Sequence, residues 1–387
     1  MVIKTNALIY DDRFRKEVQS LQRLGSKVTA SVIEDANEAR AGHDYGDGIV
    51  HDFQVFSLST KWLLKQRLFV LIHLLEFILR TCVRIYRVKP NVVWIHDPIM
   101  MVMIPFLALM RGIGIIDKVV WDHHELPIKR IDQSSFLRRV FGWFCAEADV
   151  LIAANQQRLD YLKAHYPGVA KGHKGVIRNY SDKEFIQQPS KPLPDELVSW
   201  LNGRDYFLVQ SGMVELRNFR AVAEAIIPND KFPPIVAVGG GNQALIDELK
   251  QKYGERFEQR VYMIGKVPQM ELTRYLDGAI ASIIFYQKAY GINNWLCEPN
   301  RLFQALNRNI PVIVGSNPPM AEALGRFKLG VVVDGDGSHA QALVQAIETF
   351  LTDFISGEVS DSGLTDDELA SIGWEYQDAE INRIINL

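Results

Sequence analysis

Residues 295–315, WLCEPNRLFQALNRNIPVIVG, contain the pattern that decides the fold. Apolar residues recur at helical spacing after Pro299, namely Leu302, Phe303 and Leu306. Proline suits the first helical position, because its missing N–H would have no partner there in any case. A β-branched run at 310–314 follows after a very short turn. The stretch therefore predicts a helix followed at once by a strand, which is the repeating unit of α/β sheets.

The start of this predicted helix is also a candidate binding site. The backbone amides of Asn300, Arg301 and Leu302 should point out of the helix N-terminus, where an anion, most often a phosphate, can accept their hydrogen bonds. An ordinary α/β turn, with water on those amides, explains the same residues. This stretch alone leaves both interpretations open.

Length and composition indicate an ordinary intracellular protein. A chain of 387 residues suggests two domains, and 48% hydrophobic with 23% charged residues is typical of a soluble globular protein. The three cysteines are far apart and form no CxxC, which argues against a disulfide framework or a zinc site. No signal peptide is evident, so we expect a cytoplasmic location.

Charge is distributed unevenly along the chain. Residues 1–182 carry 25 Lys+Arg and 19 Asp+Glu, a balance of +6, and the remainder carries 18 and 27, a balance of −9, which together give the net −3. A basic first half suggests an anionic partner, but no nucleic-acid module is visible, so we expect no nucleic acid.

The basic and apolar stretch 61–89 is predicted to form a long helix packed on a sheet. Its apolar centre is interrupted by His73 and Glu76, so it should not span a bilayer, which needs about 20 apolar residues. Its basic edge allows a second interpretation, a peripheral contact with anionic lipid on the inner face of the cell membrane.

Strand and helix patterns alternate almost throughout. Predicted strands in the first half are 6–10, 27–33, 91–96, 118–122 and 149–154. Those in the second half are 206–212, 234–240, 260–265, 281–286, 310–315 and 330–335. Two such series imply two parallel sheets covered by helices, with ligands outside the carboxyl ends of the strands where the strand order reverses.

The same pattern predicts the domain organisation. We expect a first domain at 1–180 and a second at 181–365, with the proline-rich stretch 183–205 as a linker. The helical tail, about 366–387, is predicted to cross back and pack on the first domain.

Seven motifs in order carry a resemblance to a known family: DDRFRKEVQSLQRLGSKV (11–28), VVWIHDP (92–98), VVWDHHELP (119–127), GVIRNYSD (175–182), VQSGMVELRNF (209–219), YMIGKVPQMELTRYL (262–276) and EPNRLFQALNRNIPVIVG (298–315). With them the chain resembles the GT-B glycosyltransferases, specifically the bacterial members of glycosyltransferase family four. The resemblance implies two facing, doubly wound Rossmann-like domains, with the acceptor on the first domain and a nucleotide-sugar on the second.

The resemblance also implies a donor site. The helix end at 300 would hold the diphosphate of a nucleoside-diphosphate sugar, without a metal ion or other cofactor. The implied donor-binding residues are Gly212, Arg217, Gly265, Lys266, Val267, Glu298, Asn300, Arg301 and Gln304. Two positions depart from the family: Gln304 stands where a ribose-binding Glu is usual, and the family's earlier Glu falls on Leu296. Gln accepts a hydrogen bond without charge, so a weaker hold on the ribose is expected.

The implied activity is a hexosyltransferase-type reaction, with retention of configuration, onto a glycan or lipid-linked acceptor in surface polysaccharide assembly. His124, Asp97 and Arg217 are the candidate catalytic residues, with Arg217 neutralising phosphate charge and Asp97 serving as base if the enzyme is inverting. Candidate acceptor-side residues are Asp12, Arg13 and Glu125. A structural histidine at 124, helix capping by Asp12 and a surface role for Arg217 explain the same residues without catalysis.

Other interpretations remain open. A non-catalytic nucleotide-sugar-binding subunit is compatible with Gln304, and a nucleotide-sugar epimerase or a phosphorylase-like enzyme would share the architecture but lacks recognisable residues of its own. The D-x-D spacing in DGDG, residues 334–337, is better explained as a surface turn than as a metal site.

Overall fold

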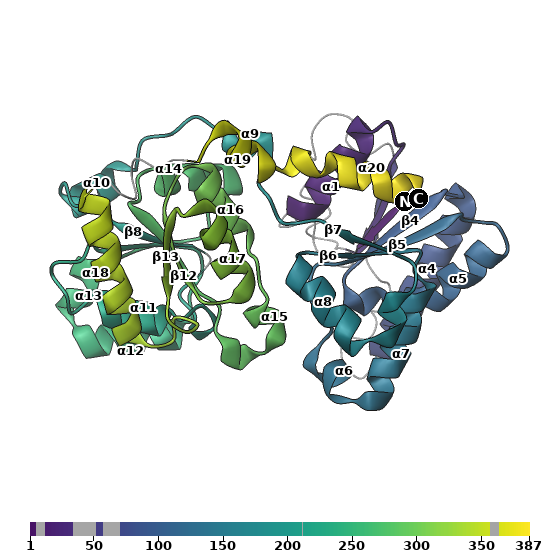
Figure 1. Ribbon diagram of the computed structural model, residues 1–387, viewed down its shortest axis with the longest axis horizontal. Coiled ribbons are helices and arrows are strands. Elements are labelled where there is room, and N and C mark those ends of the chain that lie inside the picture. The colour runs from purple at the N-terminus through teal and green to yellow at the C-terminus, as the bar shows by residue number, and fades with distance from the viewer. Residues whose placement is uncertain (5–11, 34–51, 57–69, 211, 357–363) are drawn as a thin grey trace. The chain divides into compact units, whose positions relative to one another are not determined.

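The computed structural model describes residues 1–4, 12–33, 52–56, 70–210, 212–356 and 364–387. The chain forms two compact units: unit 1 comprises Met1–Arg178 with Gln377–Leu387, and unit 2 comprises Asn179–Tyr376. Each unit is an α/β layer structure with helices on both faces of a parallel sheet (Figure 1).

Unit 1 contains a seven-stranded sheet in the order β3-β2-β1-β4-β5-β6-β7. Its strands are β1 (Val2–Lys4), β2 (Thr29–Ile33), β3 (Asp52–Phe56), β4 (Val92–His96), β5 (Lys118–His123), β6 (Val150–Ala153) and β7 (His173–Val176). All pairs are parallel, and the order reverses between β1 and β4. The strand predicted at 6–10 lies outside the described residues, and β1, β3 and β7 were not predicted. The sequence of β7, HKGV, lacks an apolar run.

The main helices of unit 1 are α1 (Asp12–Arg23), α4 (Val70–Val88), α5 (Ile104–Gly112), α6 (Lys129–Gln133), α7 (Ser135–Glu147), α8 (Gln156–His165) and α20 (Asp378–Asn386). α1 buries an apolar face that includes Phe14 and Val18, and Gly25 follows in a left-handed conformation with φ of 82°. None of the helices in the described ranges is both long and apolar enough to cross a membrane.

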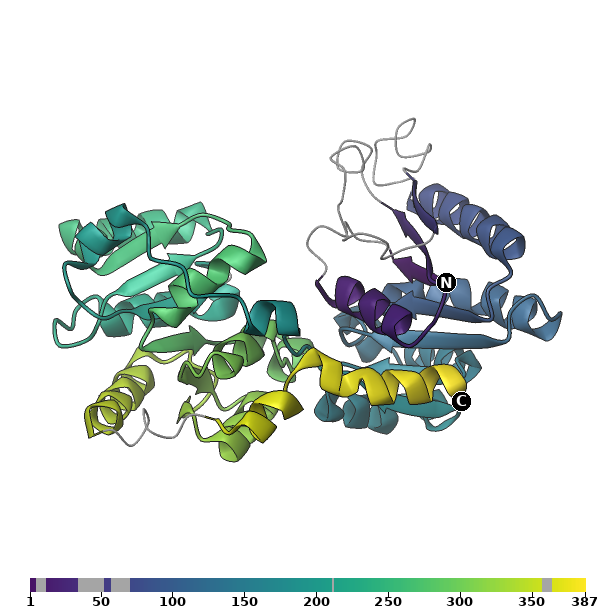
Figure 2. The same cartoon turned by 90° about the horizontal axis from the view of Figure 1, so that it is seen from above.

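The C-terminal helix α20 packs on unit 1, as predicted, beside α1 (Figure 2). The Asp378 carboxylate accepts hydrogen bonds from Ser20 Oγ at 2.6 Å and from Arg23 Nε at 2.9 Å. Ile384 is buried against β7, where a Cβ on Gly175 would lie 2.8 Å from its Cδ1. Glycine at 175 thus lets the end of the Ile384 side chain pack closely on β7.

Unit 2 contains a six-stranded parallel sheet in the order β10-β9-β8-β11-β12-β13. Its strands are β8 (Phe207–Gln210), β9 (Ile235–Val238), β10 (Val261–Ile264), β11 (Ala281–Ile284), β12 (Val312–Gly315) and β13 (Gly330–Val333). Every one of them falls within a predicted strand. The order reverses between β8 and β11, which places the expected ligand position of unit 2 at the carboxyl ends of those two strands.

The helices of unit 2 are α9 (Lys183–Ile186), α10 (Asp195–Leu201), α11 (Phe219–Ile226), α12 (Gln243–Tyr253), α13 (Glu255–Arg260), α14 (Leu272–Asp277), α15 (Ile292–Trp295), α16 (Asn300–Asn307), α17 (Pro318–Phe327), α18 (Ala340–Ser356) and α19 (Asp366–Ser371). The helix predicted from residues 295–315 is α16, but Pro299 is its N-cap rather than its first residue. The Leu302 amide donates to the Pro299 carbonyl at 3.0 Å. The prediction that the Leu302 amide points out of the helix end is therefore wrong.

The boundaries of the two units in the sequence differ slightly from those expected. The stretch 183–205, expected to be a linker, contains α9 and α10 and belongs to unit 2, because Leu197 is buried and Trp200 Nε1 donates to the Glu258 carbonyl at 2.9 Å. Residues 366–376 also belong to unit 2, so only the last part of the predicted crossing tail packs on unit 1.

Candidate functional site

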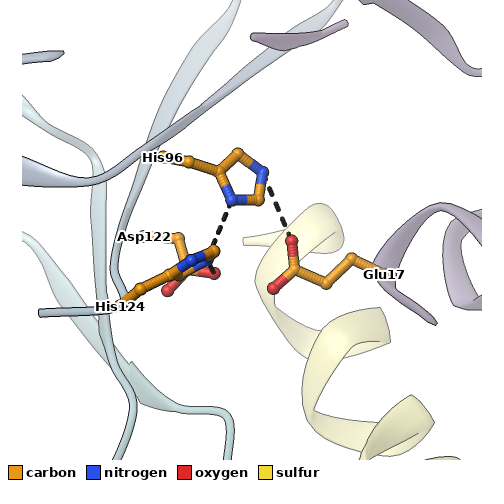
Figure 3. Close-up of side chains that lie close together, drawn as sticks. All are labelled: Glu17, His96, Asp122 and His124. Atoms are coloured by element: carbon orange, nitrogen blue, oxygen red, sulfur yellow. Dashed lines mark hydrogen bonds and ion pairs between the residues drawn. The ribbon is translucent and has the colours of Figure 1, made fainter. Parts of the chain in front are cut away.

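In unit 1, four side chains gather at the carboxyl ends of β4 and β5 and on α1: Glu17, His96, Asp122 and His124 (Figure 3). His96 Nδ1 lies 2.9 Å from His124 Nε2, and the two rings meet edge to face. His124 Nε2 also lies 3.2 Å from Asp122 Oδ2, and His96 Nε2 lies 3.3 Å from Glu17 Oε2. The result is a continuous polar network in which all members except His124 are buried.

The sheet register brings these groups together. His96 ends β4 and pairs with Asp122 on β5, and His124 follows the last residue of β5. Glu17 is contributed by α1, one turn after Arg13. Carboxyl ends of adjacent parallel strands meet at one edge of a sheet, and the network lies next to the reversal between β1 and β4.

Arg13 is the cation of the network. Its Nη2 donates to both oxygens of Asp122, at 3.0 and 2.9 Å, its Nε lies 2.8 Å from Glu17 Oε1, and its Nη1 donates to the Ile177 carbonyl at 2.7 Å. Burial alone would raise the pKa of Asp122, but the charges of Arg13 and His124 outweigh it and hold that pKa well below its usual range. Both buried carboxylates therefore have a cationic partner.

Asp97 adds a strained residue beside the network. Its φ is 67° and its ψ is 151°, a combination that non-glycine residues rarely adopt. Two hydrogen bonds fix this conformation. The Asp97 amide donates to the Asp122 carbonyl at 2.8 Å, and Trp121 Nε1 donates to the Asp97 carbonyl at 2.9 Å. Asp97 Oδ1 then lies 3.7 Å from His124 Nδ1. Strain of this kind concentrates at functional sites.

The network can hold a proton and pass it along. A nitrogen-to-nitrogen distance of 2.9 Å between His96 and His124 requires that one nitrogen carries the hydrogen and the other accepts it. If His124 is protonated, each of its nitrogens has a carboxylate nearby, Asp97 on one side and Asp122 on the other. His124 is thus the one histidine of the pair that is partly exposed and flanked by acids, which suits a proton donor or acceptor.

The same four side chains contain ligand atoms of the kinds that bind divalent metals, all within 4.8 Å of one another. Arg13 opposes such a site, because its guanidinium already binds both carboxylates. A metal ion would displace that guanidinium and leave it buried without an anionic partner, which is costly. The arrangement fits a hydrogen-bonded network better than a metal centre.

The remaining residues predicted for this side lie outside the network. Asp12 begins α1, and its carboxylate lies 2.7 Å from Arg15 Nη2 and 2.7 Å from Lys16 Nζ. Burial would raise its pKa, but Lys16 and Arg15 lower it to about 2. The Glu125 side chain is exposed to solvent and does not join the histidine pair.

His123 is a core histidine with a measurable consequence. It packs between Trp121 and Phe141, with ring centroids 4.3 and 5.7 Å away, and burial lowers its pKa to about 3. The unfolded chain takes up a proton near pH 6.5 and the folded chain does not. We therefore expect His123 alone to lower the free energy of unfolding by about 1.4 kcal/mol for each pH unit from about pH 6.5 down to 4.5.

Urea titrations of the wild type and of His123→Phe over that pH range test this expectation. The variant should show a shallower dependence by roughly that slope, since Phe suits the apolar niche and does not titrate. Asp122 does not affect this comparison, because a carboxylate with a lowered pKa changes the free energy of unfolding only at pH values below this range. Equal slopes in the two proteins would exclude His123 as the source.

In unit 2, two guanidinium groups share one aromatic ring. Arg217 lies over the Tyr286 ring at 3.7 Å from its centroid, and Arg301 lies over the same ring at 4.8 Å. Arg217 follows β8 and Tyr286 follows β11, so the group stands at the strand reversal of this sheet. Burial raises the pKa of Tyr286 to about 12, although both arginines lower it, so its phenol stays neutral at physiological pH.

The start of α16 adjoins this group. Arg301, in the first turn of α16, donates from Nη1 to the Gln210 carbonyl at the end of β8 at 2.6 Å. Asn300 is half-buried at the helix end, while Glu298 and Gln304 are buried, 2% and 5% exposed. Arg301 thus lies against the carboxyl end of β8, and Asn300 stands at the N-terminus of α16.

Glycines shape the neighbouring loops. Gly212 has φ of 108°, and a Cβ there would lie 2.7 Å from the Gly240 carbonyl oxygen. The Gly239 amide donates to the carbonyls of Ile264 and Gly265, which joins the loops after β9 and β10. Lys266 is exposed beside Gly240, and Val267 is half-buried. The loops after β8, β9 and β10 are therefore packed together.

The DGDG sequence is a turn, as predicted. Asp336 accepts hydrogen bonds from the amides of Lys288 at 2.7 Å and Ser338 at 3.1 Å, and its carbonyl accepts one from Asn218 Nδ2 at 2.7 Å. Asn218 occupies the left-handed region, with φ of 55°, directly after Arg217. The turn thus supports the loop that carries Arg217.

Sequence reasoning missed three members of these groups. The only feature of the sequence that could have indicated Glu17 is its position four residues after Arg13, on the same face of the helix. Asp122 lay within the D-x-HE motif but was not singled out, and Tyr286 ended a predicted strand. None of the three is recognisable without the sheet register that brings its partners close.

Comparisons with known proteins establish the fold. No protein-family model matches the chain, and no curated protein does. Among solved structures, it is similar to a sucrose-phosphate synthase from Thermosynechococcus elongatus, with a TM-score of 0.75 and 14% identity over 100% of this chain and 98% of that one. It is likewise similar to HepE from Anabaena in complex with UDP, with a TM-score of 0.73 and 12% identity over 100% and 98%.

A third similar structure is described as a trehalose-6-phosphate protein from E. coli bound with UDP-2-fluoro glucose, with a TM-score of 0.68 and 12% identity over 99% of both chains. The chain therefore has the GT-B architecture, with two Rossmann-like α/β units that each carry a polar group at the strand reversal. At these identities the likeness concerns the fold.

Proposed function

We propose that this chain is a glycosyltransferase that uses a nucleoside-diphosphate sugar as donor. The observation that carries the proposal is the pair of guanidinium groups of Arg217 and Arg301 over Tyr286, next to the start of α16 and at the strand reversal of unit 2. The similar HepE structures contain UDP or UDP-glucose, which supports a uridine nucleotide as the first choice.

The proposed diphosphate site follows from electrostatics. Two cations held on one ring repel each other, and a bound diphosphate would relieve that repulsion. The amides of Asn300 and Arg301 and the α16 dipole add further attraction for an anion. Gln304 would accept a hydrogen bond from the ribose, and Gly212, Gly265, Lys266 and Val267 would border the nucleotide. Glu298 would lie near the sugar.

The proposed reaction breaks the bond between the anomeric carbon and the diphosphate and forms a bond from that carbon to an acceptor oxygen. Negative charge grows on the departing phosphate, where Arg217 would stabilise it. In the retaining reaction that we favour, the departing phosphate oxygen takes the acceptor proton. His124, held between Asp97 and Asp122, would orient the reacting sugar or acceptor, with Arg13 holding the network in place.

Metal independence is part of the proposal. Arg13 engages the carboxylates that a metal in unit 1 would need, and guanidinium groups take the phosphate-neutralising role in unit 2. We expect turnover of a nucleotide-sugar to be unchanged after treatment with EDTA. Loss of turnover that manganese or magnesium restores would contradict this part of the account.

A lipid-linked acceptor is the acceptor class that we favour. Ile72, Leu75, Leu79, Val83 and Tyr86 form a stripe along α4 and are 43–60% exposed, with Arg80 and Arg87 also exposed. An apolar stripe flanked by arginines suits the surface of an anionic membrane. It would bring unit 1, the proposed acceptor side, to an acceptor in surface polysaccharide assembly.

Vesicle flotation tests the membrane contact. We expect more protein to float with vesicles that contain anionic lipid than with neutral vesicles, and less of the Leu75→Ser/Leu79→Ser double variant to float with either. Equal recovery of the wild type with both kinds of vesicle would remove the electrostatic argument.

A non-catalytic nucleotide-sugar-binding subunit is the second candidate, favoured by Gln304 and Leu296 at positions where the family has glutamates. Incubation with a panel of UDP- and GDP-sugars separates the two. An enzyme should slowly release nucleotide from at least one donor, whereas a binding subunit should be stabilised by a ligand without any turnover. Neither stabilisation nor turnover with any donor would argue against both candidates.

A further inference from the structure

A cavity of about 710 Å³ lies in unit 1, away from the network of Figure 3. Its walls include the first residues of β1, residues 26–29 at the start of β2 and residues 90–92 at the start of β4. These are the amino ends of three adjacent strands. The network of His96, Asp122 and His124 stands at the carboxyl ends, so the cavity opens at the opposite edge of the sheet and has no part in the proposed transfer.

The lining of the cavity is strongly cationic. Lys27, Arg84, Arg87 and Lys89 line it, and no aspartate or glutamate does among the described residues. In the described part of the chain, Lys27, Arg87 and Lys89 make no salt bridge either, and all three are exposed. Like charges gathered on one rim repel each other, and this repulsion falls when an anion binds between them.

The floor of the cavity is apolar. Val2, Val28 and Trp94 line it and are almost fully buried. The Trp94 indole N–H is buried and has no hydrogen-bond partner within the described residues. An apolar floor beneath a cationic rim suits a ligand with an anionic group at one end and a less polar portion at the other.

The helix dipole accounts for only part of the charge. Arg87 and Lys89 stand at the C-terminus of α4, where cations are favourable. The dipole amounts to about half an elementary charge at that end. It does not explain why Lys27, from the segment before β2, faces the same space, or why an apolar floor lies beneath.

We propose that this cavity binds a phosphate-bearing ligand, with the phosphate at the rim of Lys27, Arg87 and Lys89 and a less polar portion on the floor. Arginine and lysine at a concave surface are the usual hydrogen-bond donors to phosphate. Arginine offers two parallel N–H groups, and lysine acts as a point charge. The ligand is either a soluble phosphorylated metabolite or the headgroup of an anionic lipid. This inference does not depend on the proposed transferase activity.

The test uses the full chain and inorganic pyrophosphate as probe, with binding measured by calorimetry. The Lys27→Ala/Lys89→Ala double variant removes two exposed cations from the rim and leaves Arg87, which flanks the α4 stripe, in place. The Lys129→Ala/Arg130→Ala double variant removes two exposed cations on α6 and is the control with the same net charge. Each is made in the Arg217→Ala background, which weakens phosphate binding at the proposed donor site.

We expect pyrophosphate to bind at least roughly tenfold more weakly to the cavity variant than to the control. A second arm measures co-sedimentation with phosphatidylcholine vesicles with and without phosphatidic acid. Loss confined to the pyrophosphate arm indicates a soluble ligand, and loss of vesicle binding by the cavity variant alone indicates a lipid headgroup. Equal behaviour of the cavity variant and the control in both arms would overturn the proposal.

Discussion

Replacing Arg13 with methionine should lower the free energy of unfolding by about 3–5 kcal/mol. The guanidinium is buried and holds Asp122 at 2.9 Å and Glu17 at 2.8 Å. Methionine removes the charge but keeps much of the side chain, so both carboxylates remain buried without their cation. Removing one partner of a buried pair is far costlier than removing the whole pair. Urea denaturation near neutral pH measures the loss.

The matched control is Arg15→Met, two residues along the same helix. Arg15 pairs with Asp12 at 2.7 Å in a partly exposed position, and Lys16 also holds Asp12. Its loss should cost no more than about 1 kcal/mol. A triple variant, Arg13→Met with Asp122→Asn and Glu17→Gln, should recover part of the stability of Arg13→Met. Similar losses in Arg13→Met and Arg15→Met would mean that the network is not the buried ion cluster described above.

The second large effect concerns turnover. If Arg217 contacts the diphosphate, Arg217→Ala removes a charge-assisted contact of about 1.5–3 kcal/mol per hydrogen bond, so we expect kcat to fall roughly ten- to a hundredfold. Affinity for the free nucleotide should fall less, because charge on the phosphate grows as the glycosidic bond breaks. Steady-state kinetics on a donor that the enzyme hydrolyses, together with nucleotide titration, separates the two quantities.

Arg220→Ala is the control for this variant. Arg220 is close in sequence but pairs with Glu215 at 2.6 Å and with Glu248 at the surface. Its loss should leave both kcat and nucleotide affinity nearly unchanged. If the kcat of Arg217→Ala equals that of the wild type, Arg217 does not contact the diphosphate in the donor site.

Most of the fold could be predicted from the sequence, because strands buried in a parallel sheet are continuous apolar runs. All six strands of unit 2 had such runs, among them PIVAVGG around β9 and IPVIVG around β12. β7 was missed because its HKGV sequence has no such run and depends on packing by Ile384 of α20. The helical tail was predicted at about 366–387, but only its last part packs on unit 1, and residues 366–376 belong to unit 2.

The candidate site was predictable in its motifs and not in its contacts. His124, Asp97 and Arg217 lie in loops after strands, where α/β folds place ligands. The partners of those residues come from distant segments: Glu17 reaches His96 from α1, and Arg301 shares the Tyr286 ring with Arg217. Pairing across such separations is fixed by register and helix packing, which local patterns do not encode.

The central claim is that unit 2 holds a nucleoside diphosphate at the start of α16, and a crystal structure of the protein with UDP or GDP tests it most directly. We predict diphosphate oxygens within hydrogen-bonding distance of the Asn300 and Arg301 amides and of the Arg217 guanidinium, with the ribose against Gln304. A nucleotide bound elsewhere, or with its diphosphate away from both α16 and Arg217, would contradict the account.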